Sequence, residues 1–392
     1  MNSKVLFMIL KNWKISDLLF LKCVFYLFKL FGLATTSIQT KPSTSRFHLP
    51  LFTRSKLGQI YNVILAIGIS FVYACLIRWT IKHYEHHIIS RSHQAIDYTH
   101  TTMAMITAIF VLLVFCIQQE KFLNLGNRTV RLGELLVGFY EVQRPSKQKT
   151  LTKHVKEIYI MVGMTWLSIF VTTETGGYFK NVVYFSMIYL CNQIITLTLL
   201  QYSAILRCLQ QILWFVNENF LQFSKEPCQM DKIKIQFSKL RELYLSVCEI
   251  AEDIERFYAK PMLLCIVYVF VTLIFFASFI TKPMVSAVVI SDFQICHCSF
   301  RILHYVVALI ILVKSVTAAV SESKRTGKIV NKWLGDCNTL QVDPKIYHFS
   351  NYLLHHNLHF SVLELFSLDG SLLMSITASI TTYLVIFLQL QE

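Results

Sequence analysis

Long apolar stretches with few charged residues recur along the chain and set its expected architecture. Seven of them have the length of a membrane-crossing helix, because about 20 residues at ~1.5 Å rise span ~30 Å of hydrocarbon. The sequence therefore predicts an all-α integral membrane protein with seven transmembrane helices. The predicted spans cover residues 58–80, 101–118, 158–175, 182–203, 262–281, 302–321 and 370–390.

An earlier apolar segment, residues 18–34, differs from these spans because it contains two lysines. Lys22 and Lys29 are seven residues apart and therefore lie on one face of a helix. This pattern favours an amphipathic helix at the membrane interface over an inserted one. The segment also lacks the small-residue cleavage site of a signal peptide. We place it in a cytoplasmic amino-terminal region that covers residues 1–57.

Composition and charge place the chain in the membrane. Apolar residues make up 54% of it, with only 12 Gly and 7 Pro. A net charge of +14 would suggest nucleic acid as the partner of a soluble protein, but here the basic residues follow the connections between spans. Thirty of the 37 Lys and Arg residues fall on one predicted side and six on the other. By the positive-inside rule, the amino terminus is cytoplasmic and the carboxyl terminus extracellular. We expect a lipid bilayer, and no nucleic acid, around this protein.

This orientation divides the chain into alternating parts. Transmembrane helices one to four occupy residues 58–203, helices five and six 262–321, and helix seven with a short extracellular tail 370–392. Two long charged cytoplasmic loops, 204–261 and 322–369, lie between them. The orientation is opposite to that of a G-protein-coupled receptor, which is the first rival class with seven helices.

The sequence holds no signature of an enzyme, since Walker, GxGxxG, HExxH and GxSxG arrangements are all missing. Eleven scattered cysteines form no CxxC pair and no metal-ligand spacing, so we expect no metal and no cofactor. Cys296 and Cys298 are expected to be either free or in a disulfide. The Asn127-Arg128-Thr129 sequon falls on the predicted cytoplasmic side, so we expect it to be unglycosylated.

The last predicted span carries a polar stripe. At about 100° per residue, five polar residues fall within about 80° of one another. They are Ser371, Ser375, Ser379, Thr382 and Gln389. Polar groups facing lipid are costly, so the stripe must face protein or water. It either lines a pore, with Val385 and Ile386 as a hydrophobic constriction, or forms a close helix–helix contact through its small residues.

The same helix carries a sequence resemblance. The run Thr382-Tyr383-Leu-Val-Ile-Phe-Leu-Gln389-Leu390 resembles the hallmark of the insect gustatory receptors, which reads Thr-Tyr, five apolar residues, then Gln-Phe. Leu390 stands where the family has Phe. Upstream, residues 365–373 are similar to the family's Leu-Phe-x-Leu-Asp-x-x-Leu-Leu segment. The specific match covers about the last forty residues, and length, span count and orientation agree over the rest.

The resemblance implies an insect chemoreceptor channel fold and a ligand-gated, nonselective cation channel. Four subunits, identical or with other gustatory receptor subunits, would place their seventh helices around a central pore. Residues 204–261 and 322–369 would then form the region that anchors the subunits. Ser375, Ser379, Thr382, Val385, Ile386, Gln389 and Leu390 would line or gate the pore.

The resemblance also implies a ligand pocket in the outer half of the helical bundle. No motif defines it, so residues are chosen by depth, as aromatic walls with a few polar groups suit a small amphipathic ligand. For any single one of these residues, however, ordinary helix packing or interfacial anchoring of Tyr and Trp is the favoured explanation. The chosen residues are Trp166, Thr173, Glu174, Tyr184, Tyr189, Asn192, His304 and Tyr305.

One charge falls well inside a predicted span. Lys314 lies in the sixth span, where a charge costs at least about 2.5–3.5 kcal/mol at the bilayer centre. It therefore either snorkels towards the cytoplasm or faces the bundle interior. In the second case Asp369, near the inner end of the seventh span, is at a suitable depth to pair with it.

We therefore expect a gustatory receptor subunit in the plasma membrane of chemosensory neurons. A bitter compound is the default expectation for its small-molecule tastant, with a sugar or a contact pheromone as alternatives. Leu384 follows the Thr-Tyr pair where sugar receptors of the family tend to carry Glu. A secondary transporter is the second rival class, and it predicts broken helices with paired ionisable residues at the midplane.

Overall fold

The computed structural model describes most of the chain, and within those residues it is almost entirely helical. The described residues are 24–40, 50–84, 91–140, 163, 182–223, 230–285, 292–336, 344–356 and 358–389. Two short antiparallel hairpins accompany the helices: β1 (Thr36–Thr40) pairs with β2 (Pro50–Arg54), and β3 (Ser361–Val362) with β4 (Phe366–Ser367). The helices are α3 (Lys56–Tyr84), α4 (Arg91–Ile117), α5 (Gln119–Tyr140), α7 (Val182–Phe223), α8 (Met230–Val285), α9 (Asp292–Asp336), α10 (Pro344–His355) and α11 (Gly370–Gln389).

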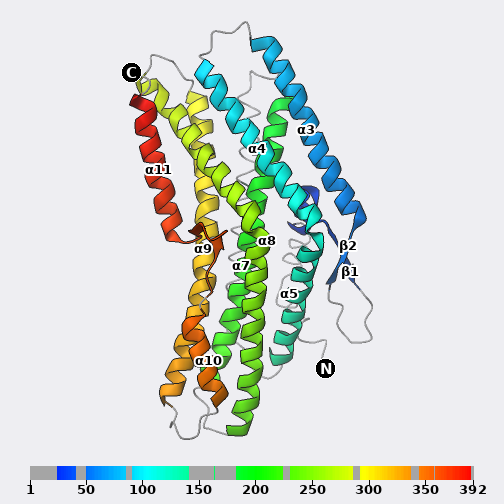
Figure 1. The fold of residues 1–392 in the computed structure, drawn as a ribbon, viewed down its shortest axis with the longest axis vertical. Helices are drawn as coiled ribbons and strands as arrows, with labels where there is room; N and C mark the ends of the chain where they lie inside the picture. Colours follow the sequence, from blue (N-terminus) through cyan, green and yellow to red (C-terminus); the bar gives the residue numbers. More distant parts are fainter. Residues whose placement is uncertain are drawn as a thin grey trace.

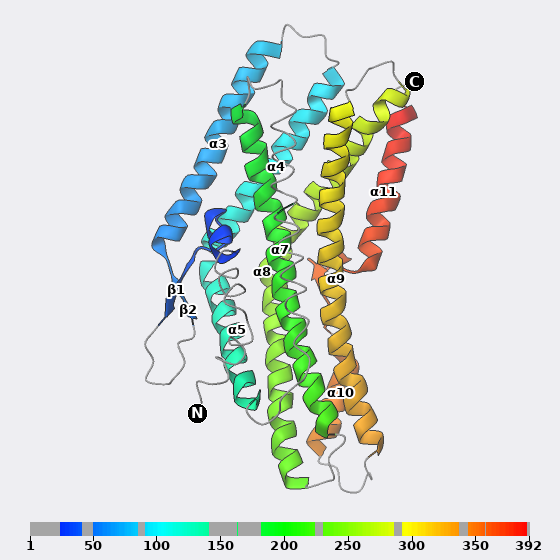
Figure 2. The same cartoon turned by 180° about the vertical axis from the view of Figure 1, so that it is seen from behind.

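Three long helices form the spine of the molecule. Figure 1 shows α7, α8 and α9 running side by side over nearly its full length, and the reverse view in Figure 2 agrees. Helices α3, α4 and α11 flank the upper part of this spine, and α5 and α10 flank the lower part. We call the upper part, in which α7, α8 and α9 lie beside α3, α4 and α11, the membrane half. The lower part is the polar half.

The predicted spans coincide with these helices. Five described helices are long and apolar enough to cross a membrane, and α11 carries a shorter apolar length, Gly370–Ile386. The five apolar lengths are Lys56–Cys75, Thr99–Ile117, Ile188–Leu221, Phe237–Thr281 and Ile295–Gly335. Of the predicted third span, 158–175, the structure describes only residue 163. The described part thus confirms a helix at each of the other six positions.

The two predicted cytoplasmic connections form much of the polar half, and their described residues are largely helical. Within residues 204–261 and 322–369, α7 continues to Phe223, α8 starts at Met230, α9 continues to Asp336 and α10 follows. Apolar residues at helical spacing explain these helices, because they give each extension a buried face. On α8 this face consists of Leu240, Tyr244, Val247, Ala251, Ile254 and Tyr258, all buried.

The amino-terminal region contains a hairpin that the sequence did not predict. Residues 24–30 form a short helix, and the chain then turns at Gly32 with φ of 77° and enters β1. A Cβ at Gly32 would lie 2.5 Å from Leu112, so glycine is required there. The amide of Asn127 holds β2 by accepting from the Phe52 N–H at 2.9 Å and donating to its carbonyl at 3.1 Å. The Asn127 side chain therefore has a structural role.

An aromatic cluster joins the two halves. The ring of Phe115, at the end of α4, lies 5.5 Å from Phe122 of α5 and 5.2 Å from Phe257 of α8. Phe257 in turn contacts the ring of Tyr258 at 4.9 Å. Such edge-to-face contacts add to the free energy of burying the rings. Apolar packing thus stabilises the junction between α4 and α5.

Candidate functional site

Four helices bring polar side chains together inside the membrane half, near the end at which α4, α7 and α9 begin. We call this group the buried polar cluster. Each member is at most 6% exposed, which is unusual for such residue types. Its members are His100 of α4, Asn192 of α7, Tyr268 of α8, and Arg301, His304 and Tyr305 of α9.

Hydrogen bonds connect three of these helices and fix the position of one proton. Tyr268 donates its hydroxyl hydrogen to the amide oxygen of Asn192. Thr272 donates its own to the Tyr268 carbonyl at 2.7 Å. Both hydroxyl oxygens are left as acceptors, so the His100 Nε2–H must donate to them, at 3.1 Å for Thr272 and 3.2 Å for Tyr268. The network therefore defines the tautomer of His100.

A second set of contacts surrounds His304. Its Nε2 lies 3.2 Å from the Thr196 hydroxyl, and its ring meets Tyr305 edge-on at 5.2 Å. Tyr305 also meets Tyr268 edge-on at 6.2 Å. Through these rings α7, α8 and α9 are packed into one polar and aromatic interior.

Arg301 is the charged member of the cluster. Its guanidinium carbon lies 5.1 Å from the ring centre of Tyr189 and 5.9 Å from those of Phe276 and Tyr305. The faces of aromatic rings attract cations, so these three rings form a partial cage around the charge. Among the described residues, no carboxylate forms an ion pair with Arg301. The membrane half thus holds a buried cation supported by rings.

The structure brings together four of the residues chosen by depth from the sequence. Tyr189, Asn192, His304 and Tyr305 are all buried and lie in or against the buried polar cluster. Tyr184 belongs to α7, and its side chain is outside the described part. Trp166, Thr173 and Glu174 also lie outside the described residues.

Sequence reasoning missed His100, Tyr268 and Arg301. The sequence places Arg301 in the outer connection between the fifth and sixth predicted spans, because the apolar run of the sixth span begins at residue 302. The structure instead starts α9 at Asp292 and buries Arg301. A usable signal was present, since Arg301, His304 and Tyr305 are spaced i, i+3 and i+4 on one helix face. Nearby, Cys298 is buried and Cys296 is exposed, and both are free thiols.

The suggested pair between Lys314 and Asp369 does not form. Lys314 is exposed on α9. Asp369 instead caps α11, because its Oδ1 accepts from the Ser371 backbone N–H at 2.9 Å and from the Ser371 hydroxyl. These hydrogen bonds hold the pKa of Asp369 below its ordinary value. Asp369 therefore stabilises the start of α11 and not a contact with α9.

The polar stripe of α11 faces away from its own bundle. Leu372 and Ile376 bury the opposite side of the helix, and Tyr383 meets Phe270 of α8 edge-on at 6.2 Å. By contrast Ser371, Ser375, Thr382 and Gln389 are exposed and Ser379 is half-buried, while Val385 and Ile386 are 48% and 42% exposed. Leu390 lies outside the described residues.

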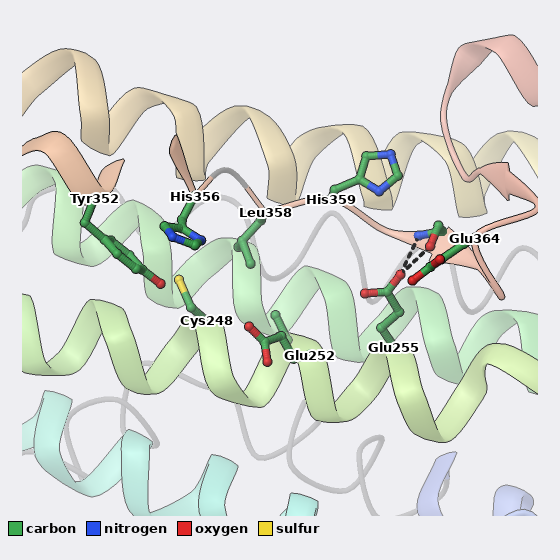
Figure 3. A pocket seen from close by; sticks show the side chains of 10 residues that line it. Cys248, Glu252, Glu255, Tyr352, His356, Leu358, His359 and Glu364 are labelled. Carbon is green, nitrogen blue, oxygen red and sulfur yellow. Dashed lines mark hydrogen bonds between the residues drawn. The ribbon is translucent and has the colours of Figure 1, made fainter. Parts of the chain in front are cut away.

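A cavity of about 300 Å³ lies in the polar half below α11, shown in Figure 3. Carboxylates and aromatic rings line it, among them Glu252, Glu255 and Glu364 with Tyr352 and His356. Burial raises the pKa of the Tyr352 phenol, and nearby carboxylates add to this. No group of three His, Cys, Asp or Glu side chains in the described residues could hold a metal ion.

The wall of this cavity ties α8 to the segment that leads into α11. The Glu255 carboxylate accepts from the backbone N–H of Ser361 at 2.8 Å and from its hydroxyl at 2.7 Å, drawn as dashed lines in Figure 3. Ser361 begins the β3–β4 hairpin, whose turn residues Leu363 and Glu364 have φ of 50° and 58°. A tight, strained turn anchored on α8 therefore precedes the cap of α11.

The comparisons with known proteins agree with these features. A sequence profile of the family described as 7tm chemosensory receptor matches residues 21–392. The Drosophila melanogaster protein named as gustatory receptor 28b is 28% identical over 153 residues, which cover 38% of this chain and 33% of that protein. The one named as gustatory receptor 28a is 24% identical over 147 residues, covering 36% and 33%. This chain thus aligns with a third of the length of these two relatives.

Solved structures show the same fold. The structure of the insect olfactory receptor OR5 from Machilis hrabei in complex with eugenol has a TM-score of 0.66 and 12% identity to this chain. The alignment covers 98% of this chain and 99% of that receptor. A second structure of OR5 gives a TM-score of 0.66 at 11% identity. The profile extends over nearly the whole chain, which therefore belongs to the 7tm chemosensory receptor family, a family of receptors and not of enzymes, and is a multi-pass membrane protein.

Proposed function

We propose that this chain is a gustatory receptor subunit that forms a ligand-gated, nonselective cation channel, with four subunits placing α11 around a central pore. The observation that carries the proposal is the direction of the α11 polar stripe. Residues that the bundle does not cover are exposed along it, whereas the apolar side is buried against α8 and α9. We further propose that the channel acts in the plasma membrane of chemosensory neurons, with its amino terminus in the cytoplasm.

The chemistry of the stripe suits water better than lipid. Hydroxyl groups in hydrocarbon need hydrogen-bond partners, and the Thr382 hydroxyl donates to the Ala378 carbonyl at 3.0 Å. Such a bond leaves the hydroxyl oxygen free to accept from water or to meet a permeating cation. Val385 and Ile386 follow towards the outer end and supply an apolar ring that would close the pore by dewetting.

The buried polar cluster is the proposed ligand site. It lies within the membrane half, where aromatic walls surround a few polar groups as in small-molecule sites. Tyr268 of the cluster and Phe270, which contacts Tyr383 of α11, are two residues apart on α8. A ligand that moves this part of α8 would therefore act directly on the pore helix. The expected ligand is a small tastant, with a bitter compound as the first choice.

Cysteine accessibility tests the pore proposal. Thr382→Cys and Ser379→Cys place a thiol on the stripe, and Leu372→Cys places one on the buried side as the matched control. In cells that express the chain, a charged thiol reagent applied during stimulation should irreversibly change the ligand-evoked current of the two stripe variants only. Equal modification of Leu372→Cys, or none at either stripe position in a functional channel, would contradict the proposal.

A further inference from the structure

Arg301 has no acidic partner among the described residues, although it is only 4% exposed. Its Nε–H has no hydrogen-bond acceptor there, and the rings of Tyr189, Phe276 and Tyr305 are its closest support. Rings attract the positive charge through their faces but accept no strong hydrogen bond. A guanidinium carries five N–H donors in a fixed planar fork. The rings therefore support the charge, while the Nε–H of Arg301 stays without an acceptor among the described residues.

Polar groups next to Arg301 also lack hydrogen-bond partners among the described residues. The side-chain amide nitrogen of Asn192 is a donor without an acceptor among the described residues. The Nδ1 atom of His304 is likewise without a partner there. Each of these residues is at most 3% exposed. Buried donors that stay unpaired destabilise a protein, so several in one place indicate that an acceptor-rich group belongs among them.

We propose that the ligand of this receptor is an organic anion, a small carboxylate with an apolar or aromatic body, and that Arg301 binds its carboxylate. A carboxylate presents two acceptor oxygens that match the guanidinium fork, which gives a bidentate, charge-assisted pair. The rings of Tyr189, Tyr268, Phe276 and Tyr305 suit the body of such a ligand. The inference rests on the proposed function in one respect, since it names the ligand class of the same site.

The test measures binding without requiring a current. The full-length receptor, purified in detergent, is heated in the presence of matched pairs of probes at neutral pH: benzoate against benzamide, and phenylacetate against phenylacetamide. A ligand that binds the folded state raises its melting temperature. We expect the carboxylates to act at an at least about tenfold lower concentration than the amides, because charge-assisted pairs are stronger than neutral ones.

Substitutions assign the effect to Arg301. Arg301→Gln should abolish the preference for the carboxylate without lowering the melting temperature of the ligand-free protein, because it removes a buried charge that has no acidic partner among the described residues. Arg325→Gln is the matched control on the same helix, in the polar half, and should keep the preference. If Arg301→Gln does not fold, Arg301→Lys should fold and retain a weakened preference, since it keeps the charge and loses the fork.

Several outcomes would overturn the inference. They are equal action of both members of each pair, no effect of either carboxylate at millimolar concentration, and a preference that survives Arg301→Gln. Glu174→Gln tests whether a carboxylate of the chain itself pairs with Arg301. Residue 174 lies outside the described residues. Loss of ligand-free stability in both Arg301→Gln and Glu174→Gln would reveal such an internal pair. A carboxylate preference without any ligand-evoked current would instead reject the channel proposal and leave this inference standing.

Discussion

The membrane half and the polar half share the helices α7, α8 and α9, yet they accommodate arginine differently. In the polar half, Arg128 bonds to Glu249 at 2.6 Å and to Asp253 at 2.5 Å, and Arg325 bonds to Glu218 at 2.9 Å. These side chains remain between about a third and two thirds exposed. In the membrane half, Arg301 is buried among rings.

The ion pairs of the polar half join neighbouring helices, whereas the buried charge of the membrane half is the one that we propose as a ligand contact. Exposed ion pairs contribute roughly 0.2–1 kcal/mol each, so those of the polar half fine-tune the packing between helices. A buried guanidinium that has no carboxylate partner lowers the stability of a fold. The membrane half therefore holds the cluster that we propose as the ligand site, whereas the ion pairs of the polar half join α5 to α8 and α7 to α9.

The largest expected effect concerns the junction of the two halves. Phe115→Ala should lower the free energy of unfolding by about 3–5 kcal/mol, because it opens a cavity in the aromatic cluster. Phe71→Ala, on the exposed side of α3, is the matched control and should cost far less. Thermal unfolding of the detergent-solubilised receptor measures both. Similar losses in the two variants would show that the halves are not held together at this level.

The next effect is confined to the buried network. Tyr268→Phe leaves the Asn192 amide oxygen without its donor and should cost about 1–3 kcal/mol. Tyr61→Phe removes a hydrogen bond to the Leu30 carbonyl at an exposed position, so it should cost well under half of that. The same thermal assay compares them. A larger loss in Tyr61→Phe would remove the contrast between buried and exposed polar contacts.

A smaller effect is expected at the start of α11. Asp369→Ala should cost about 1 kcal/mol through loss of the cap, whereas Asp369→Asn should be nearly neutral. Because hydrogen bonding lowers the pKa of Asp369, its contribution is complete above its ordinary value of 3.8 and is lost as the pH falls through the lowered pKa. Unfolding measured at neutral and acidic pH checks both statements. Equal losses in the two variants would mean that charge, rather than capping, matters.

The smallest effect belongs to the polar half. Arg128→Ala should cost at most about 1 kcal/mol, and salt should weaken the contribution of the wild-type side chain. Melting of wild type and variant at low and high salt measures this difference, with Arg131→Ala on the same helix as the control. A loss above that range that is insensitive to salt would make this ion pair a major structural contact.

Several features were predictable because they depend on short stretches of chain. The described spans follow from the length of the apolar runs, and the polar stripe of α11 follows from the spacing of its Ser, Thr and Gln residues. The cap at Asp369 was missed, although an Asp before Gly370-Ser371 at a helix start is a local capping signal. The β1–β2 hairpin was also missed, because Asn127 stabilises it from far along the chain.

The burial of Arg301 could not be predicted from its neighbours in the sequence. Read along the chain, it precedes an apolar run and resembles a connection residue. It is a buried residue because Tyr189 of α7 and Phe276 of α8 close over it, and both lie at least 25 residues away in sequence. The amino-acid order was sufficient for the number, length and polar faces of the helices, since these depend on neighbours within a few turns. Which polar groups meet in the interior, and which remain unpaired there, depended on the packing of four helices, because burial is a property that distant segments confer on one another.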